Sequence, residues 1–168
     1  MPERKTLLLV EDEALIAMNE SDILTKHGYS VITAGTPKKA ITAVKDKKID
    51  LILMDIDLGE NRIDGTQTAE EILAMKELPI VFLTSHTERE MVEKVKGITR
   101  YGYVLKGAGE FVLLEAITMA FELFEAHQIL LKENRERKRA EEKLQETAAQ
   151  YSHLMDNSID AVYYLSEE

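Results

Sequence analysis

Short apolar runs alternate with amphipathic stretches over the first two-thirds of the chain. Five of these runs are apolar almost throughout, which is typical of strands buried on both faces of a sheet. They span residues 7–10, 29–33, 49–54, 79–83 and 101–105. The stretches between them are helical in pattern, including a polar one before the fifth strand, and one begins with Thr36 as an N-cap and Pro37 at the first helical position. Alternating strands and helices predict an α/β fold with a doubly wound, five-stranded parallel sheet.

A long helical pattern begins at Glu110. Its first apolar residues recur every three or four positions, as expected for a helix that packs on the sheet. We expect the helix to continue to about Asp156, because residues 132–143 contain no Gly or Pro and carry favourable pairs such as Glu133 and Arg137, four apart. One seam of this helix is apolar except near its middle. The seam contains Leu123, Leu130, Leu144, Ala148, Tyr151 and Met155.

Two interpretations of the helix beyond the sheet remain open. It is either a solvated bridge between two domains or one strand of a parallel, two-stranded coiled coil, in which Asn134 would favour in-register pairing. The second interpretation predicts a homodimer. We therefore divide the chain into a domain at residues 1–125, a long helix or coiled-coil linker at 126–156, and a final segment at 157–168.

The final segment reads as a turn at Asn157 and Ser158 followed by strand-like residues up to Leu165. One short strand has nothing to pair with here. We therefore expect residues 157–168 to be the truncated start of another module.

Composition narrows the classes of function. The 168 residues carry a formal net charge of −10, which disfavours nonspecific binding to nucleic acid or to anionic lipid. The chain has no cysteine, so disulfides, thiolate metal sites and thiol nucleophiles are excluded. No apolar run approaches the ~20 residues that span a bilayer, and the N-terminus does not resemble a signal peptide. We expect a cytoplasmic protein that binds neither membrane nor nucleic acid.

Polar residues follow the apolar runs at the places where a doubly wound sheet carries its function, the carboxyl ends of its strands. Carboxylates held close together raise each other's pKa unless a cation neutralises them, and oxygen ligands suit Mg²⁺ or Mn²⁺. A carboxylate beside such an ion can attack phosphorus, with an ammonium group balancing the charge. The residues in question are Glu11, Asp12, Asp55, Thr84, Ser85 and Lys106.

Four separated motifs resemble the receiver domain of two-component response regulators, a flavodoxin-like fold. The motifs are Leu9-Val10-Glu11-Asp12-Glu13, Leu53-Met54-Asp55-Ile56-Asp57-Leu58, Leu83-Thr84-Ser85 and Tyr103-Val104-Leu105-Lys106. The resemblance covers roughly residues 5–125, in the expected order and on the expected elements. It implies a signalling module with no enzyme activity beyond its own phosphotransfer and autodephosphorylation. Its partner would be a histidine kinase or a phosphotransfer protein.

The same resemblance implies a role for each site residue. Asp55 would be the phosphoacceptor, and Glu11, Asp12, Asp55 and the backbone carbonyl of Asp57 would hold Mg²⁺. Thr84 and Ser85 would lie at the phosphoryl group, Lys106 would pair with it, and Tyr103 would turn inward on activation. Asp57 and His86 occupy positions that tune dephosphorylation in this family. The conformational change that follows phosphorylation would be relayed through the fifth-helix face and the C-terminal linker.

The chain departs from the family pattern in two loops. Lys106 is followed by Gly107 rather than by the usual proline, which leaves a cis peptide at this point in doubt because a cis bond before a non-proline residue costs about 2.5–4 kcal/mol. The loop from Asp55 to Gly65 lacks the customary proline and is slightly longer than usual.

A second, shorter resemblance lies beyond the first domain. The helix from Arg135 and the sequence Tyr151-Ser152-His153-Leu154-Met155-Asp156-Asn157-Ser158-Ile159-Asp160-Ala161 are similar to the linker and opening of a PAS sensor domain. This resemblance implies that a sensor module follows the receiver.

Three other kinds of protein fit these residues less well than a receiver. A haloacid-dehalogenase-type phosphohydrolase would use Asp55 and Asp57 as nucleophile and acid, but that family places its metal-binding acidic pair after the lysine. A histidine kinase or phosphotransfer protein would use His153, which lacks the acidic neighbour and downstream proline of that motif. A structural adaptor with a vestigial pocket would have no need of the complete acidic set.

Overall fold

A computed structural model describes residues 4–58, 65–85, 97–98 and 101–165, the last ten of these by their backbone only. Strands and helices alternate along the first 110 residues, as the sequence predicts. The elements are β1 (Thr6–Val10), α1 (Ala14–Lys26), β2 (Ser30–Ala34), α2 (Pro37–Asp46), β3 (Leu51–Asp55), α3 (Gly65–Met75), β4 (Ile80–Thr84), β5 (Tyr103–Leu105) and α5 (Glu110–Leu165).

The five strands form one sheet in the order β2-β1-β3-β4-β5. Every pairing between neighbours is parallel. The chain moves outward from β1 to β2, returns to β3 on the other side of β1, and then continues to β4 and β5. The predicted fold class, a doubly wound five-stranded parallel sheet with a long C-terminal helix, is confirmed.

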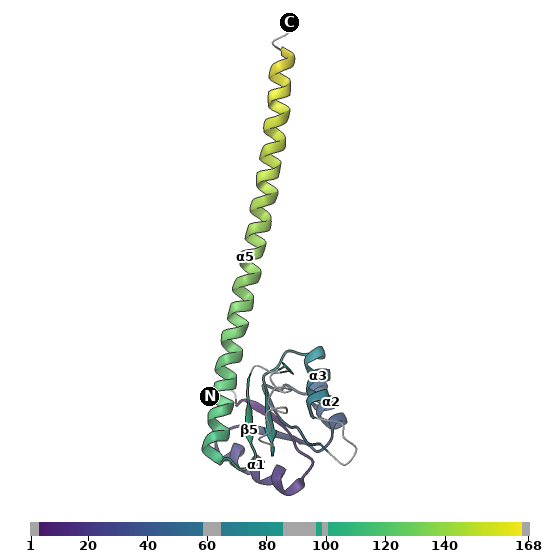
Figure 1. Ribbon diagram of the computed structural model, residues 1–168, viewed down its shortest axis with the longest axis vertical. Coiled ribbons are helices and arrows are strands. Elements are labelled where there is room, and N and C mark those ends of the chain that lie inside the picture. The colour runs from purple at the N-terminus through teal and green to yellow at the C-terminus, as the bar shows by residue number, and fades with distance from the viewer. Residues whose placement is uncertain (1–3, 59–64, 86–96, 99–100, 166–168) are drawn as a thin grey trace. The chain divides into compact units, whose positions relative to one another are not determined.

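Side chains that alternate along each strand point to opposite faces of the sheet, and the central strands β1, β3 and β4 are buried on both faces. Leu8 and Val10 of β1 belong to a core shared with α2 and α3. Leu7 and Leu9 belong to a second core, shared with α1 and the beginning of α5. Figure 1 shows these two layers of helix on either side of the strands. The arrangement explains why the three central strands have no polar face.

Local signals set the ends of the helices. The Thr36 side chain accepts a hydrogen bond from the Lys39 N–H at 3.3 Å, and Pro37 occupies the first position of α2, which confirms the predicted N-cap. Helix α1 ends at Lys26, before Gly28, whose φ of 89° lies in the left-handed region that glycine adopts without strain.

Helix α5 runs without interruption through 56 residues. Its contacts divide the chain into two units, residues 1–125 and 126–168. In the first unit Leu113, Ile117 and Ala120 are buried against the sheet. In the second unit no side chain between residues 126 and 155 is buried.

The turn and strand expected within residues 157–165 are wrong, because α5 continues to Leu165. A helix satisfies its backbone hydrogen bonds internally, whereas an isolated strand has no neighbour to bond. Once the helix has formed, each added residue costs little, so it continues through residues whose pattern resembles a strand.

Two other predictions fall mostly on residues that the structure does not describe. The polar helix expected between β4 and β5 lies outside the described residues except for 97–98, which are helical. The loop that leads from Asp57 to Gly65 is described only up to residue 58. No helix in the described part of the chain has the length and hydropathy needed to cross a membrane.

Candidate functional site

Four strands of the sheet end side by side and bring polar residues together at their carboxyl edge. Backbone hydrogen bonds hold the ends in register: the Glu11 N–H donates to Ala34 O at 3.1 Å, and the Lys106 N–H donates to Thr84 O at 2.8 Å. Glu11 and Asp12 follow β1, Asp55 and Thr84 are the last residues of β3 and β4, and Lys106 follows β5. The sequence predicted this grouping from the polar residues that follow four of the five apolar runs.

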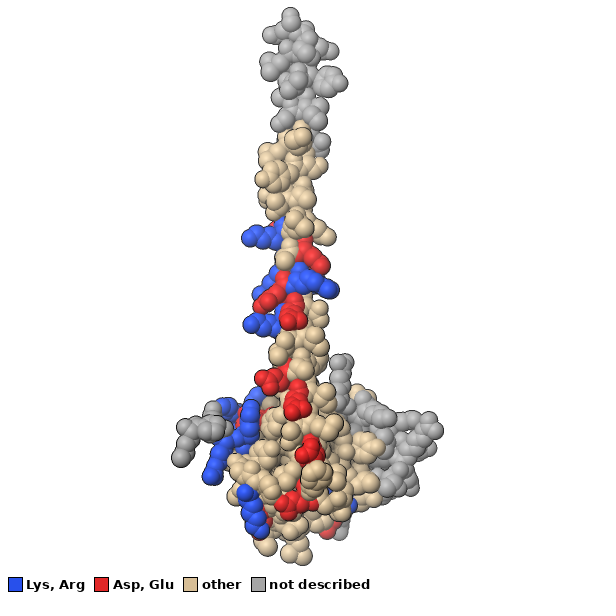
Figure 2. Space-filling view, turned by 90° about the vertical axis from the view of Figure 1, so that its left-hand side faces the viewer, with Lys and Arg blue, Asp and Glu red and all other residues tan. Residues whose placement is uncertain are grey.

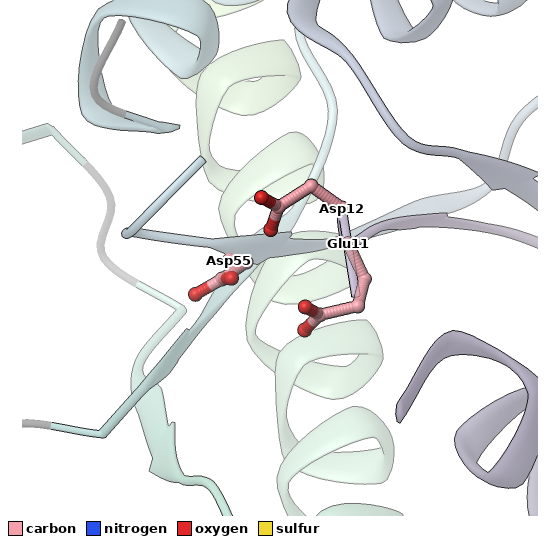
Figure 3. A group of neighbouring side chains, drawn as sticks. All are labelled: Glu11, Asp12 and Asp55. Carbon is pink, nitrogen blue, oxygen red and sulfur yellow. The ribbon is translucent and has the colours of Figure 1, made fainter. Parts of the chain in front are cut away.

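Three carboxylates converge at this edge (Figure 3). Glu11, Asp12 and Asp55 each offer an oxygen, and these oxygens lie within 4.8 Å of one another. Glu11 and Asp55 are buried, with 2% and 1% of their surfaces exposed, whereas Asp12 is exposed. Three anionic oxygens so close together repel one another unless a cation lies among them.

The Lys106 ammonium group lies against two of these carboxylates. Its Nζ donates a hydrogen bond to Asp55 Oδ2 at 2.7 Å. It also lies 2.7 Å from Glu11 Oε2, an ion-pair contact that is outside hydrogen-bond alignment. Burial lowers the pKa of Lys106, but the close contacts with Asp55 and Glu11 outweigh this effect and raise it, so the group stays charged.

Asp55 has an unusual electrostatic environment. Burial raises its pKa to about 6; the hydrogen bond from Lys106 opposes this rise and the charge of Glu11 adds to it. The Asp57 N–H also donates to Asp55 Oδ1 at 3.1 Å. Both oxygens of Asp55 are therefore held in place, one by an ammonium group and one by the backbone.

The approach of α3 to the end of β3 depends on a glycine. A Cβ added to Gly65 would lie 1.8 Å from the backbone oxygen of Asp55, which no side chain can tolerate. The Gly65 N–H donates to Ile56 O at 2.8 Å and fixes this approach. Gly65 thus allows the first turn of α3 to pack directly behind Asp55.

Of the remaining predicted site residues, the structure describes Thr84, Ser85 and Tyr103. Thr84 is buried at the end of β4, and the neighbouring Ser85 is exposed. Tyr103 on β5 is 40% exposed, so its ring is not enclosed by the described residues. His86 lies outside the described residues. No peptide bond in the described part is cis, and Gly107 after Lys106 has a φ of 81°, which a proline cannot adopt.

Glu20 is a site residue that the sequence analysis missed. Its side chain on α1 is half-buried, and its Oε2 is buried without a hydrogen-bond partner among the described residues. Burial raises the pKa of Glu20 to about 7; the charges of Glu11 and Asp55 raise it further, while Lys106 lowers it. The signal was present in the sequence, because Glu20 falls at helical spacing between Ala17 and Leu24, the buried residues of α1.

Replacing Glu20 by Gln should stabilise the metal-free protein at neutral pH. The pKa of Glu20 is about 7 in the folded chain against an ordinary 4.5. Between these values the unfolded chain has lost the proton and the folded chain keeps it, so this group makes stability fall as pH rises. The melting temperature of Glu20→Gln minus that of wild type, measured in EDTA, should be near zero below pH 4.5 and reach a few degrees above pH 7.

The control for this prediction is Asp46→Asn, which removes the same charge from an exposed position at the end of α2. Its melting temperature should follow wild type across the range. A constant offset between Glu20→Gln and wild type at every pH would mean that packing, not the carboxyl charge, causes the difference.

Comparison with known protein families matches residues 7–118 to the response regulator receiver domain. The chain belongs to this family. It is therefore a phosphoryl-accepting receiver of two-component signalling, and no finding favours a haloacid-dehalogenase-type phosphohydrolase. Receiver domains are typically signalling modules rather than enzymes. They bind Mg²⁺ at an acidic pocket, and the chain has an acidic group of this kind in Glu11, Asp12 and Asp55.

The relatives of this receiver are proteins of different kinds. The transcriptional regulatory protein PdtaR of Mycobacterium tuberculosis is 33% identical over 121 residues, which are 71% of this chain and 58% of that protein. A protein-glutamate methylesterase/protein-glutamine glutaminase of Archaeoglobus fulgidus is 35% identical over 66% of this chain and 32% of its own length. The chain thus spans less than two-thirds of these relatives, and the second shows that some receivers belong to enzymes.

A solved structure extends the comparison. The N-terminal domain of a response regulator/sensory box/GGDEF three-domain protein from Carboxydothermus hydrogenoformans is 48% identical, with a TM-score of 0.67. The match covers 73% of this chain and 98% of that domain.

Proposed function

We propose that Asp55 is the phosphoacceptor of this receiver. The supporting observation is its carboxylate, buried at the end of β3, hydrogen-bonded to the Lys106 ammonium group and grouped with two further carboxylates. An Asp55 oxygen attacks the phosphorus atom of a donor, the bond from phosphorus to the donor breaks, and an aspartyl phosphate forms. The donor is a phosphohistidine of a histidine kinase or of a phosphotransfer protein. Phosphorylation by acetyl phosphate, set out in the Discussion, tests this assignment.

The residues around Asp55 have separate tasks in this transfer. Lys106 balances negative charge on the phosphoryl oxygens, and Thr84, buried at the end of the adjacent strand, donates its hydroxyl to one of them. The Asp57 N–H orients the Asp55 carboxylate. Asp57 and His86 lie where the family tunes dephosphorylation, and we assign the lifetime of the phosphoryl group to them.

The donor set fits a hard divalent cation. Glu11, Asp12 and Asp55 offer only carboxylate oxygens within 4.8 Å of one another, which is the chemistry that Mg²⁺ or Mn²⁺ requires. The backbone carbonyl of Asp57 would add a fourth protein ligand. When bound, the ion would neutralise charge on the attacking and transferring oxygens.

Replacing Asp12 by Asn should weaken Mg²⁺ binding about tenfold or more, because it removes one anionic ligand from a site with few. The melting temperature without metal should hold or rise as repulsion among the carboxylates is relieved. Calorimetric titration with MgCl₂ measures the affinity, and Asp46→Asn controls for the loss of one charge. An unchanged affinity in Asp12→Asn would move the metal site elsewhere.

Thr84 and Tyr103 form the proposed switch. Thr84 lies on β4 and Tyr103 on the neighbouring β5, where Phe82 and Tyr103 are partners in the register. We expect Thr84 to move toward the phosphoryl group and the half-exposed Tyr103 ring to turn inward, which changes the face formed by β5 and the start of α5. NMR of the Tyr103 ring with and without beryllofluoride tests this switch, and identical spectra would contradict it.

Helix α5 is proposed to relay the conformational change of the receiver to the module that follows. Its second unit presents exposed apolar residues at helical spacing, among them Leu130, Leu144 and Tyr151, which suit pairing with a second copy. Charged side chains of both signs gather between the ends of this seam (Figure 2), so the pairing is modest in strength. We propose a receiver at residues 1–125, a coiled-coil linker at 126–156 and the start of a PAS-like module at 157–168. The relative with a sensory box supports this order of modules.

A further inference from the structure

Lys106 has the same carboxylates as partners that the proposed metal site uses. Its ammonium group contacts Asp55 Oδ2 and Glu11 Oε2, both at 2.7 Å. A divalent cation and an ammonium group compete for such oxygens, because both are attracted by the same negative charge. Lys106 therefore has to give up at least one contact when the carboxylates become metal ligands.

The contact with Glu11 is the weaker of the two. The ammonium group makes an aligned hydrogen bond with Asp55, whereas its contact with Glu11 is outside hydrogen-bond alignment. Side-chain hydrogen bonds lose most of their strength when they are misaligned. Glu11 is thus the partner that Lys106 can leave at the lower cost.

A third carboxylate lines the same pocket as this lysine. Glu20 of α1 and Lys106 line one small pocket of about 110 Å³, which Asn19, Ile23 and Leu113 also border. Glu20 Oε2 is buried and has no hydrogen-bond partner among the described residues. A half-buried carboxylate that lacks a partner gains considerably from an ammonium group, more than an exposed one would.

We propose that Glu20 is a positioning residue that accepts the Lys106 ammonium group when Glu11 is engaged as a metal ligand. This inference rests on the proposed function of the site. The flexible four-carbon stem of lysine allows the ammonium group to turn from Glu11 toward Glu20 while the backbone of residue 106 stays bonded to Thr84. Lys106 then remains at the site, next to the phosphoryl group it has to neutralise, rather than moving into solvent.

The electrostatics agree with this arrangement. The pKa of Glu20 is raised by burial and by the charges of Glu11 and Asp55, and Lys106 is the group that lowers it. An approach of Lys106 would therefore favour the ionised form of Glu20 still further. A divalent cation at Glu11 and Asp55 would act in the same direction, by neutralising the two charges that now disfavour ionisation.

A double-mutant cycle on Mg²⁺ affinity tests the proposal with the full chain. Calorimetry would compare wild type, Glu20→Gln, Lys106→Met and the double variant in titrations with MgCl₂ alone. Glu20→Gln should raise the dissociation constant about threefold to tenfold, the loss expected for one charged hydrogen bond in a half-buried place. In the Lys106→Met background the same change should have little effect, because no ammonium group needs a new partner.

Three outcomes decide the result. If Glu20→Gln binds Mg²⁺ as Asp46→Asn does, the proposal is overturned. If Glu20→Gln weakens binding equally with and without Lys106, Glu20 acts by direct attraction of the ion and the proposal is again overturned. If wild type binds no Mg²⁺, the proposed function itself fails, which separates the two failures. Lys106→Gln replaces Lys106→Met if the latter does not fold.

A second readout follows the lysine directly. The ¹⁵N resonance of Lys106 Nζ should shift when MgCl₂ is added to wild type, and should shift to a different position in Glu20→Gln. An equal shift in both proteins would contradict a role for Glu20 as the new partner, whereas a role confined to packing would not move this resonance.

Discussion

Asp55→Asn should take up no phosphoryl group from acetyl phosphate under conditions in which wild type takes up one per chain. Asparagine keeps the shape of the side chain but offers no anionic oxygen to attack phosphorus. Asp55 accepts an aligned hydrogen bond from the Lys106 ammonium group. Intact-protein mass spectrometry measures the uptake, and EDTA should abolish it in wild type.

The control for this experiment is Asp46→Asn, which changes the same functional group on the exposed end of α2. It should be phosphorylated as wild type is. Equal labelling of Asp55→Asn and wild type would sink the assignment of the phosphoacceptor. Labelling in the presence of EDTA would leave Asp55 in place but remove the metal from the reaction.

Loss of two leucines from the α5 seam should convert a dimer to a monomer. Leu130 and Leu144 are 57% and 71% exposed, so they contribute little to the stability of a single chain and are free to pack against a second copy. Replacing both by Asn should weaken self-association at least about a hundredfold, because each buried leucine contributes about 2 kcal/mol or more. Sedimentation equilibrium at tens of micromolar measures the mass.

A matched control replaces Arg139 and Glu146, which lie on the opposite side of α5 and are exposed. Changing both to Asn keeps the net charge and should leave the dimer intact. A chain truncated after Leu123, which lacks most of the seam, should be monomeric. If the full chain is itself a monomer at these concentrations, the coiled coil is wrong and residues 126–156 form a solvated bridge.

The fold and the main site were accessible from the sequence for one physical reason. A strand buried on both faces cannot carry polar residues, so the first polar residue after each apolar run marks the end of that strand. Asp55 was found in this way, because it is the last residue of β3, a strand that is buried throughout. Lys106 follows β5, an edge strand on which Tyr103 and Leu105 are exposed, and was found because the apolar run ends there as well. Parallel strands then bring those ends to one edge without any knowledge of the packing.

Glu20 and Gly65 were missed because their importance depends on distances between elements. The spacing of Glu20 with Ala17 and Leu24 indicates that it lies toward the buried side of α1, but the sequence does not say that it shares a pocket with Lys106. The backbone oxygen behind Gly65 belongs to another element as well. The strand predicted within residues 157–165 was also wrong. The local preference of these residues for a strand is weaker than the gain from extending a helix that has already formed.

Gly65 contributes to the geometry of the site although it has no side chain. Asp55 can lie where it does because one methyl group is missing from the facing turn of α3. The backbone position of Asp55 therefore depends in part on the absence of a side chain from residue 65, a requirement that the charges and polar contacts of the site do not reveal.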